Sequence, residues 1–187
     1  MAGMRPDHIV FIVDDDRRIR ESLIELLTSF DLHAVAFGSA AEYIAYPKPD
    51  VPACLILDLE LPDMNGLDLQ SRIAAGDHPH IVFITGHGDI PSSVRAIKAG
   101  AVDFLPKPFR TEDLMRAIHS ALQQNREAQL EAGELAGLHR RLSRLTPREL
   151  EALPLIVSGL LNKQAAAELG ISGITLQIHR SKNMKKV

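Results

Sequence analysis

The stretch HIVFIVDDD, residues 8–16, decides the fold. Its first six residues form a short apolar run rich in β-branched side chains, which is typical of a buried strand. Three aspartates follow directly, and a helical pattern of apolar residues comes after them, at Ile19, Leu23, Leu26 and Leu27. A buried strand that leads straight into a helix predicts the first half of a unit with parallel strands.

The alternation of strand and helix continues to about residue 122. Further strands are expected at residues 33–37, 53–57, 81–84 and 102–105, and helices near residues 67–75, near 90–99 and from 111 onward. Ser39 and Glu42 form a capping-box pattern that starts another helix. Gly100 is expected to end the helix at about residues 90–99. Continuous apolar strands alternating with helices predict an α/β fold: a doubly wound, five-stranded parallel sheet covered on both faces.

Charge divides the chain into two parts. Residues 1–139 carry 12 Lys and Arg against 21 Asp and Glu, a net charge of −9, whereas residues 140–187 carry 9 against 3, a net charge of +6. A basic rear part predicts a second module that meets a polyanion, although a solvated basic face would explain the same charge.

The chain carries no pattern that predicts export or a membrane span. No stretch approaches the roughly 20 apolar residues that a span needs, and the first residues lack the order of a signal peptide. Cys54 is the single cysteine, so no internal disulfide can form. We therefore expect a cytoplasmic protein with no membrane partner.

The rear part predicts a helical linker that leads into a small all-helical domain. From residue 111 the helical pattern continues almost to Leu145, and four leucines are spaced as in a heptad repeat: Leu135, Leu138, Leu142 and Leu145. This leucine seam either contacts a second chain or packs on the C-terminal domain. The domain begins with a capping pattern at Thr146 and Glu149.

Two further helices are expected in the small domain. Pro154 should kink or break the first helix, because proline removes a backbone hydrogen bond. A second helix at about residues 162–169 ends at Gly170, and Ser172 can cap a third. Two helices joined by a turn that contains glycine make a helix-turn-helix, in which we expect Ile174 to pack inward.

Polar side chains follow the predicted strands at their carboxyl ends. In a doubly wound sheet, ligands bind outside these ends, so the groups are expected to meet at one edge. Clustered carboxylates repel one another unless a cation compensates them, and Mg²⁺ prefers such oxygen ligands. The residues are Asp14, Asp15 and Asp16 after the first strand, Asp58 after the third, Thr85 after the fourth and Lys107 after the fifth.

A site of this kind can bring a phosphodonor to a carboxylate nucleophile, which then forms an aspartyl phosphate. Lys107 would balance the charge on the transferred group, and Thr85 would donate a hydrogen bond to it. The structural alternative is that the aspartates cap a helix and that the lysine is an ordinary turn residue. The joint placement of these groups at the ends of separate strands favours the functional interpretation.

Four motifs of this chain resemble the receiver motifs of two-component response regulators, most of all those of the FixJ/NarL group. They are Val13-Asp-Asp15, residues 58–66 (DLELPDMNG), residues 84–89 (ITGHGD) and residues 107–109 (KPF). They occur in order, and the resemblance covers residues 8–122. It implies a CheY-like, flavodoxin-like receiver domain that accepts a phosphoryl group from a sensor histidine kinase.

The resemblance also implies roles for individual residues. Asp58 would be the phosphoacceptor. Asp14 and Asp15 would hold Mg²⁺, with Asp15 bound directly and Asp14 through a water molecule. Asp58 and the backbone carbonyl of Glu60 would complete the protein's ligands.

On the other side of the phosphoryl group, the resemblance implies a switch. Lys107 would pair with the phosphoryl group and would precede a cis bond to Pro108. Thr85 would be the switch hydroxyl, and Phe104 the aromatic residue that turns inward with it. Phosphorylation would repack the face formed by residues 90–99 and 102–105, and a homodimer formed on phosphorylation is a further hypothesis.

The segment after residue 143 resembles a LuxR-type helix-turn-helix, through residues 162–172 (NKQAAAELGIS), 175–180 (TLQIHR) and 184–187 (MKKV). The resemblance implies that the third helix enters the major groove of double-stranded DNA. The residues expected at the DNA are Lys163, Thr175, Gln177, Arg180, Ser181, Lys182 and Lys185. The family usually has one more helix behind this one, which this sequence is expected to lack.

Three functions remain open from the sequence. The first is a response regulator with a receiver domain (1–122), a helical linker (123–142) and a DNA-binding domain (143–187) that regulates transcription, and that is not an enzyme. The second is a phosphatase of the haloacid-dehalogenase kind, which also uses an aspartyl phosphate with Mg²⁺. The third is a receiver that acts only through protein contacts.

Overall fold

The computed structural model of the chain describes residues 7–73, 79–86, 90–158, 160–172 and 174–177. It divides the chain into two compact units, Met1–Gln129 and Leu130–Val187. In the described ranges, none of the helices has both the length and the apolar character that crossing a bilayer requires.

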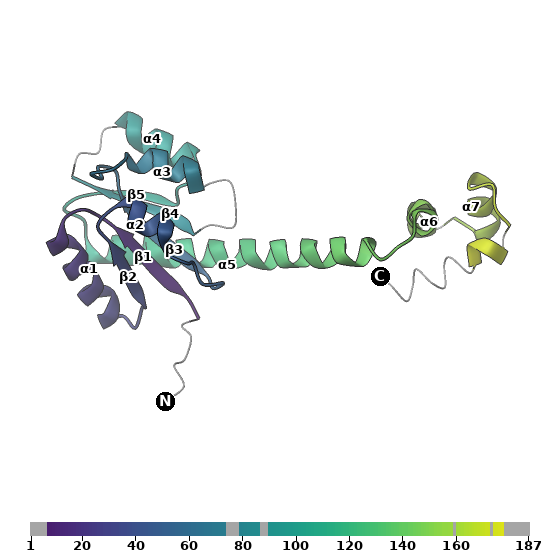
Figure 1. Ribbon diagram of the computed structural model, residues 1–187, viewed down its shortest axis with the longest axis horizontal. Coiled ribbons are helices and arrows are strands. Elements are labelled where there is room, and N and C mark those ends of the chain that lie inside the picture. Colours follow the sequence, from purple (N-terminus) through teal and green to yellow (C-terminus); the bar gives the residue numbers. More distant parts are fainter. Residues whose placement is uncertain (1–6, 74–78, 87–89, 159, 173, 178–187) are drawn as a thin grey trace. The chain divides into compact units, whose positions relative to one another are not determined.

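The first unit is built on a five-stranded parallel sheet with the strand order β2-β1-β3-β4-β5 (Figure 1). The predicted doubly wound α/β fold is therefore confirmed. The chain order reverses between β1 and β3, which is where sheets of this kind bind their ligands. The strands are β1 (Ile9–Val13), β2 (Ala34–Phe37), β3 (Ala53–Asp58), β4 (His80–Thr85) and β5 (Asp103–Pro106).

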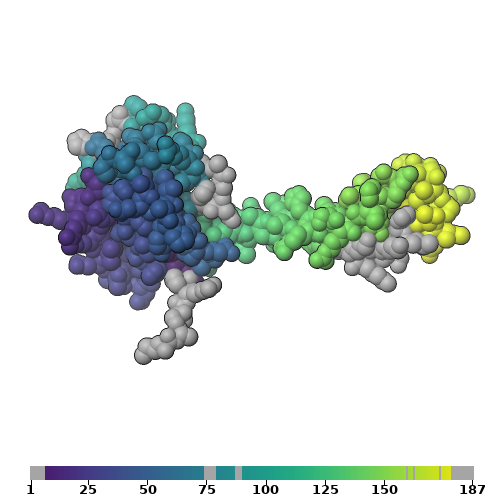
Figure 2. Space-filling view, in the orientation of Figure 1, coloured from purple at the N-terminus to yellow at the C-terminus, as the bar shows by residue number. Residues whose placement is uncertain are grey.

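Helices cover both faces of this sheet. Alternate residues of each strand point to opposite faces, so two separate apolar layers form. Helices α2 (Ala40–Ala45), α3 (Gly66–Ile73) and α4 (Ile90–Lys98) pack on one face, and Figure 2 shows the part of the chain that contains α2 and α3 at the surface of the first unit. Helices α1 (Arg17–Ser29) and α5 (Thr111–Leu142) pack on the other face.

Capping groups place the ends of these helices. The Asp16 carboxylate accepts a hydrogen bond from the Arg18 amide and caps α1. Ser39 caps α2 as predicted. Gly100 follows α4 with φ of +93°, a conformation that side chains other than glycine rarely adopt, so the predicted stop is confirmed.

A buried side chain ties α5 to the edge of the sheet opposite the aspartates. The Asn125 side-chain oxygen accepts a 2.8 Å hydrogen bond from the Ala53 amide at the start of β3. Its side-chain nitrogen lies 3.3 Å from Nδ1 of His80 at the start of β4, and burial lowers the pKa of His80. One helix residue thus joins the starts of two central strands.

The second unit contains the last part of α5, from Leu130, together with α6 (Pro147–Val157), α7 (Asn162–Glu168) and the helical residues 174–177. Thr146 and Glu149 form both halves of the capping box of α6. Ser172 Oγ accepts a hydrogen bond from the Thr175 amide and caps the helical residues 174–177. The buried centre is small and rich in alanine: Ala152, Ala165, Ala166 and Leu176.

One expectation for this unit is wrong, and another is narrowed. Of the kink or break expected at Pro154, a break does not occur, and helix α6 continues to Val157, because the proline ring fixes φ near the helical value and only one hydrogen bond is lost. Ile174 is 74% exposed, whereas Leu176 is fully buried. Two residues correspond to roughly 200° around a helix, so these two side chains cannot share a face.

The tether between α5 and the sheet can be tested by replacing Asn125 with alanine. We expect the free energy of unfolding to fall by about 1–3 kcal/mol, because the buried Ala53 amide loses its acceptor. Urea unfolding of the full chain measures this. The exposed neighbour Gln124→Ala is the control, with an expected change within about 0.5 kcal/mol. Equal stability of the two variants would show that the tether contributes nothing.

Candidate functional site

The predicted polar residues lie together at the carboxyl edge of the sheet. Three loops bring them there, those after β1, β3 and β4, together with the segment after β5. They surround a cavity of about 290 Å³. Its lining consists of Asp14, Asp15, Asp16, Ile19, Asp58, Glu60, Thr85, Gly86 and Lys107.

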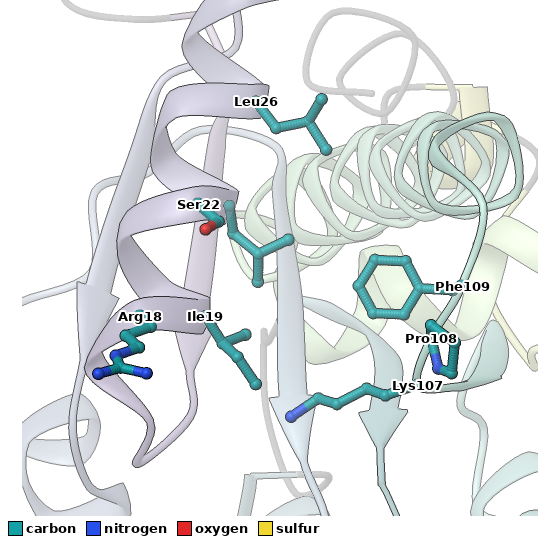
Figure 3. Close-up of a pocket in the computed structure, with 8 residues that line it drawn as sticks. Arg18, Ile19, Ser22, Leu26, Lys107, Pro108 and Phe109 are labelled. Atoms are coloured by element: carbon teal, nitrogen blue, oxygen red, sulfur yellow. The ribbon is translucent and has the colours of Figure 1, made fainter.

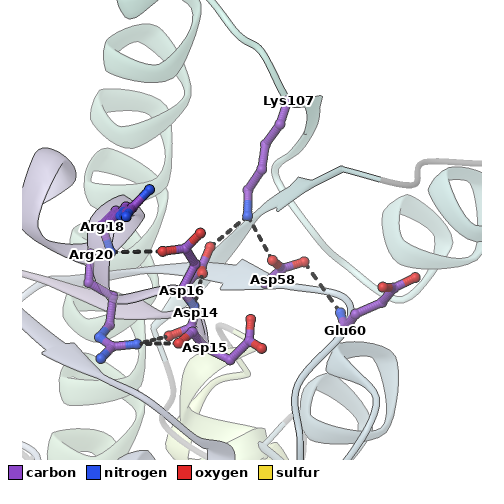
Figure 4. Close-up of polar contacts among 8 residues, drawn as sticks. All are labelled: Asp14, Asp15, Asp16, Arg18, Arg20, Asp58, Glu60 and Lys107. Atoms are coloured by element: carbon purple, nitrogen blue, oxygen red, sulfur yellow. Dashed lines mark hydrogen bonds and ion pairs between the residues drawn. The ribbon is translucent and has the colours of Figure 1, made fainter.

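The Lys107 ammonium lies between two buried carboxylates. Its Nζ is 2.6 Å from Asp14 Oδ2 and 2.7 Å from Asp58 Oδ2 (Figure 4). The Asp14 side chain is fully buried and that of Asp58 is 10% exposed. Burial opposes the charge of Lys107, but the hydrogen bonds to both carboxylates outweigh it and raise the pKa of Lys107. This cation therefore offsets the repulsion between the two acids.

The turn that carries the first aspartates is held by Arg20, a residue of α1. Its guanidinium donates to the backbone carbonyls of Asp14 at 2.7 Å and Asp15 at 2.9 Å. The Asp14 carboxylate also accepts a 2.8 Å hydrogen bond from the Asp16 amide. These bonds leave the Asp15 side chain exposed at the mouth of the cavity, whereas Asp16 serves as the cap of α1.

Oxygen atoms suited to a divalent cation converge on the same cavity. One carboxylate oxygen from each of Asp14, Asp15 and Asp58 can be chosen so that all three lie within 4.8 Å of one another. Hard cations such as Mg²⁺ take oxygen ligands of this kind, so the donor set fits that ion. Glu60 lines the cavity too, and its amide donates to Asp58 at 3.3 Å.

The other side of the cavity is formed by β4 and β5. Thr85 is buried at the end of β4, and its carbonyl accepts a 2.7 Å hydrogen bond from the Lys107 amide. The Lys107–Pro108 bond is cis, as the resemblance implied. Phe104 is partly buried on β5, and its ring centroid lies 6.1 Å from that of Phe83.

A second, apolar hollow of about 380 Å³ adjoins this cavity (Figure 3). It lies between α1 and the start of the segment that leads into α5. Ile19 and Lys107 line both hollows. The remaining lining residues are Arg18, Ser22, Leu23, Leu26, Pro108 and Phe109.

Known protein families correspond to both units. The description "Response regulator receiver domain" matches residues 10–119, and "Bacterial regulatory proteins, luxR family" matches residues 143–187. The chain belongs to the two-component response regulators. The match to bacterial regulatory proteins and the similarity to a transcriptional regulatory protein support the response regulator function over the phosphatase alternative.

Individual relatives align with nearly the whole of this chain. The chain is 48% identical over 180 residues to Nodulation protein W of Bradyrhizobium diazoefficiens, and the alignment covers 96% of this chain and 79% of the relative. It is 39% identical over 186 residues to Transcriptional regulatory protein FixJ of Rhizobium meliloti, covering 97% and 89%. The solved structure of the response regulator StyR has a TM-score of 0.85 at 43% identity, covering 96% of this chain and 91% of that one.

The residues predicted at DNA lie only partly within the described ranges of this response regulator. Lys163, Thr175 and Gln177 are exposed, and Lys163 and Gln177 line one shallow hollow beside α7. The other predicted DNA residues lie outside the described ranges: Arg180, Ser181, Lys182 and Lys185.

Sequence reasoning missed Arg20, which holds this site in place, and Gln70, which joins α3 to α4. Arg20 fixes the turn of the aspartates, and Gln70 of α3 donates to the carbonyls of Ala96 and Ala99 at the end of α4, at 3.1 and 3.2 Å. Arg20 lies one helical turn after the cap of α1, and this spacing is the one signal that could have pointed to it.

The role of the Lys107 ammonium can be tested by the variant Lys107→Gln. Without a metal ion, we expect the free energy of unfolding to fall by about 3 kcal/mol, because two buried carboxylates lose their shared cation. Urea unfolding measures this loss, and adding Mg²⁺ should recover part of it. The exposed Lys98→Gln is the matched control. A Lys107→Gln protein as stable as this control would contradict the account.

Proposed function

We propose that Asp58 accepts a phosphoryl group from the histidine of a sensor kinase, in a reaction that requires Mg²⁺. The observation that carries the proposal is the pairing of the Asp58 carboxylate with Lys107 at 2.7 Å, inside a cavity that Asp14, Asp15 and Thr85 also line. An Asp58 oxygen attacks phosphorus, the phosphorus–nitrogen bond of the phosphohistidine breaks, and its electron pair leaves with the imidazole.

The side chains around Asp58 would have two roles, binding the cation and balancing the charge of the phosphoryl group. Asp14, Asp15 and Asp58, with the carbonyl of Glu60, would hold the cation. Bound Mg²⁺ would neutralise part of the phosphoryl charge and orient its oxygens. After phosphoryl transfer, the Lys107 ammonium would leave the carboxylates that it contacts now and would pair with the phosphoryl oxygens, because the new group carries roughly −1.5 to −2 charges at neutral pH.

We further propose that Thr85 and Phe104 carry the change to α4 and β5. Thr85 lines the cavity at the end of β4 and would donate its hydroxyl hydrogen to a phosphoryl oxygen. Movement of that side chain would open space for Phe104, which packs against Phe83. A repacked surface on α4 and β5 would then favour a homodimer, a local change with a readout elsewhere in the molecule.

We assign the apolar hollow beside the site to the sensor kinase. A phosphohistidine is carried on a protein, so its partner needs a surface to dock on next to Asp58. The hollow shares Ile19 and Lys107 with the phosphoacceptor cavity and presents Leu23, Leu26 and Phe109 as apolar contacts. A helix of the kinase that presents apolar side chains around its histidine fits this surface.

We assign the rear of the chain to double-stranded DNA in the cytoplasm. The proposed division is a receiver domain at residues 1–122, a linker at 123–142 and a DNA-binding domain at 143–187. The net charge of +6 after residue 139 suits a polyanion. Lys163 and Lys185 would bind phosphates, while the base-reading side chains would be Thr175, Gln177, Arg180, Ser181 and Lys182.

Phosphorylation is tested by incubating the full chain with Mg²⁺ and acetyl phosphate and measuring intact mass. We expect one added phosphoryl group on the wild type, none on Asp58→Asn and none without Mg²⁺. Asp50→Asn, an exposed aspartate that precedes β3, should still gain the group. An adduct that persists on Asp58→Asn would assign the chemistry to another residue.

DNA binding is tested by fluorescence anisotropy of labelled duplexes at several salt concentrations. We expect Lys163→Gln to weaken binding to all duplexes and to lower the salt slope by about one, because one phosphate contact is lost. Lys98→Gln, in the receiver domain, should leave both quantities unchanged. A wild-type chain that shows no salt-dependent binding would instead favour a receiver that acts only through protein contacts.

A further inference from the structure

The last turns of α5 present large apolar side chains to solvent. Leu135 is 56% exposed and Leu138 is 43% exposed, and Leu142 follows four residues later, partly buried. This 3-4 spacing is that of the a and d positions of a coiled coil. Leu145 lies beyond the end of the helix and is 6% exposed, so the seam within α5 consists of the first three leucines.

Little within this stretch stabilises it as an isolated helix. Gly133 and Gly137 lie inside it, and a methyl group placed at either would meet no atom within 4 Å. Close packing therefore does not require these glycines, which weaken a helix interior. Residues 131–136 are all exposed. Short helices without packing are marginal in water, so this helix would gain from a partner along its apolar side.

We propose that Leu135, Leu138 and Leu142 pair with the same residues of a second copy, in a parallel and in-register coiled coil. The charges beside the seam suit this partner. Glu134 and His139 take the g and e positions, which face each other across a parallel pair. The His139 Nδ1 lies 3.0 Å from the Leu135 carbonyl, which can only accept, so Nδ1 donates. A second hydrogen on Nε2 would make the ring a cation that donates to the Glu134 carboxylate of the second copy.

The opposite orientation is disfavoured by charge. An antiparallel pair that packs Leu138 against Leu142 is centred on Arg140. In an antiparallel pair the g positions face each other, so Arg141 of one helix would face Arg141 of the second copy. These like charges repel, whereas the parallel pair brings each Glu134 to His139 of the second copy.

Because the seam is short, the two linkers would pair only when a second contact also holds the two copies together. Three leucines per copy are too few for a tight dimer, but a contact between receiver domains would make the pairing of the linkers intramolecular and raise its effective concentration. The inference rests on the proposed function at this point: phosphorylation of Asp58 would bring the linkers together. The paired helices would in turn hold two DNA-binding domains at a defined spacing.

A disulfide across the seam tests the parallel register directly. In a full-length Leu138→Cys variant, the two new thiols would face each other and form a disulfide on mild oxidation. The native Cys54 does not interfere, because it is fully buried and burial raises the pKa of its thiol. Ala136→Cys, exposed and away from the seam, is the matched control.

Non-reducing gels would follow covalent dimer formation over a range of protein concentrations, with and without Mg²⁺ and acetyl phosphate. We expect Leu138→Cys to cross-link at least about tenfold faster than Ala136→Cys, and at lower concentration after phosphorylation. Equal rates for the two variants in both conditions would overturn the pairing. Intact mass of the same samples reports phosphorylation separately, so a failure at Asp58 cannot be mistaken for a failure of the seam.

Charge exchange tests the partner assignment. In the Leu138→Cys background, Glu134→Lys and His139→Glu should each slow cross-linking by about two- to threefold, because each removes the attraction and His139→Glu adds repulsion. The double variant restores opposite charges and should recover the parent rate. A double variant no faster than the single ones would contradict the parallel arrangement, and circular dichroism of each protein controls for lost helix.

Discussion

The contact of one ammonium with two buried carboxylates is the interaction on which the first unit depends. Asp14 and Asp58 come from neighbouring strands, and their side chains would repel each other without a cation between them. Lys107 supplies that cation from the segment after β5, at 2.6 and 2.7 Å. A positive charge therefore lies beside Asp58, the proposed nucleophile, in a charge balance that a phosphoryl group and a metal ion would change.

The sheet makes this contact possible. The order β2-β1-β3-β4-β5 places the ends of β1 and β3 side by side where the chain order reverses, and the two apolar layers hold those ends in place. Arg20 then fixes the backbone of the first loop, and Asn125 fixes α5 at the opposite edge. The strands thus connect the acidic site at one edge of the sheet with α5 at the opposite edge, and α5 continues into the second unit.

The strands and the acidic edge could be predicted because their signals are local. Each strand is an apolar run of a few residues, and Asp14, Asp58 and Lys107 each stand directly after one. The polar contacts made by Gln70 and Asn125 could not be predicted, because each depends on how a helix docks against a distant strand or helix. The contacts of Arg20 are local, and its position one turn after the cap of α1 is the signal that could have pointed to it.

Expectations were wrong or were narrowed where packing overrides a local rule. Of the kink or break expected at Pro154, a break did not occur, since one lost hydrogen bond is tolerated when the rest of α6 is capped and packed. Ile174 was expected inside because it is apolar, but Leu176 occupies the core and leaves Ile174 on the other side of the helix.

The most direct measurement is a high-resolution structure of the full chain with Mg²⁺ and beryllium trifluoride, which mimics a phosphoryl group on an aspartate. We expect the adduct on Asp58, Mg²⁺ between Asp15, Asp58 and the carbonyl of Glu60, and the Lys107 ammonium moved from Asp14 to a fluorine atom. A structure in which Lys107 still bridges Asp14 and Asp58, with the adduct absent or on another residue, would contradict this expectation.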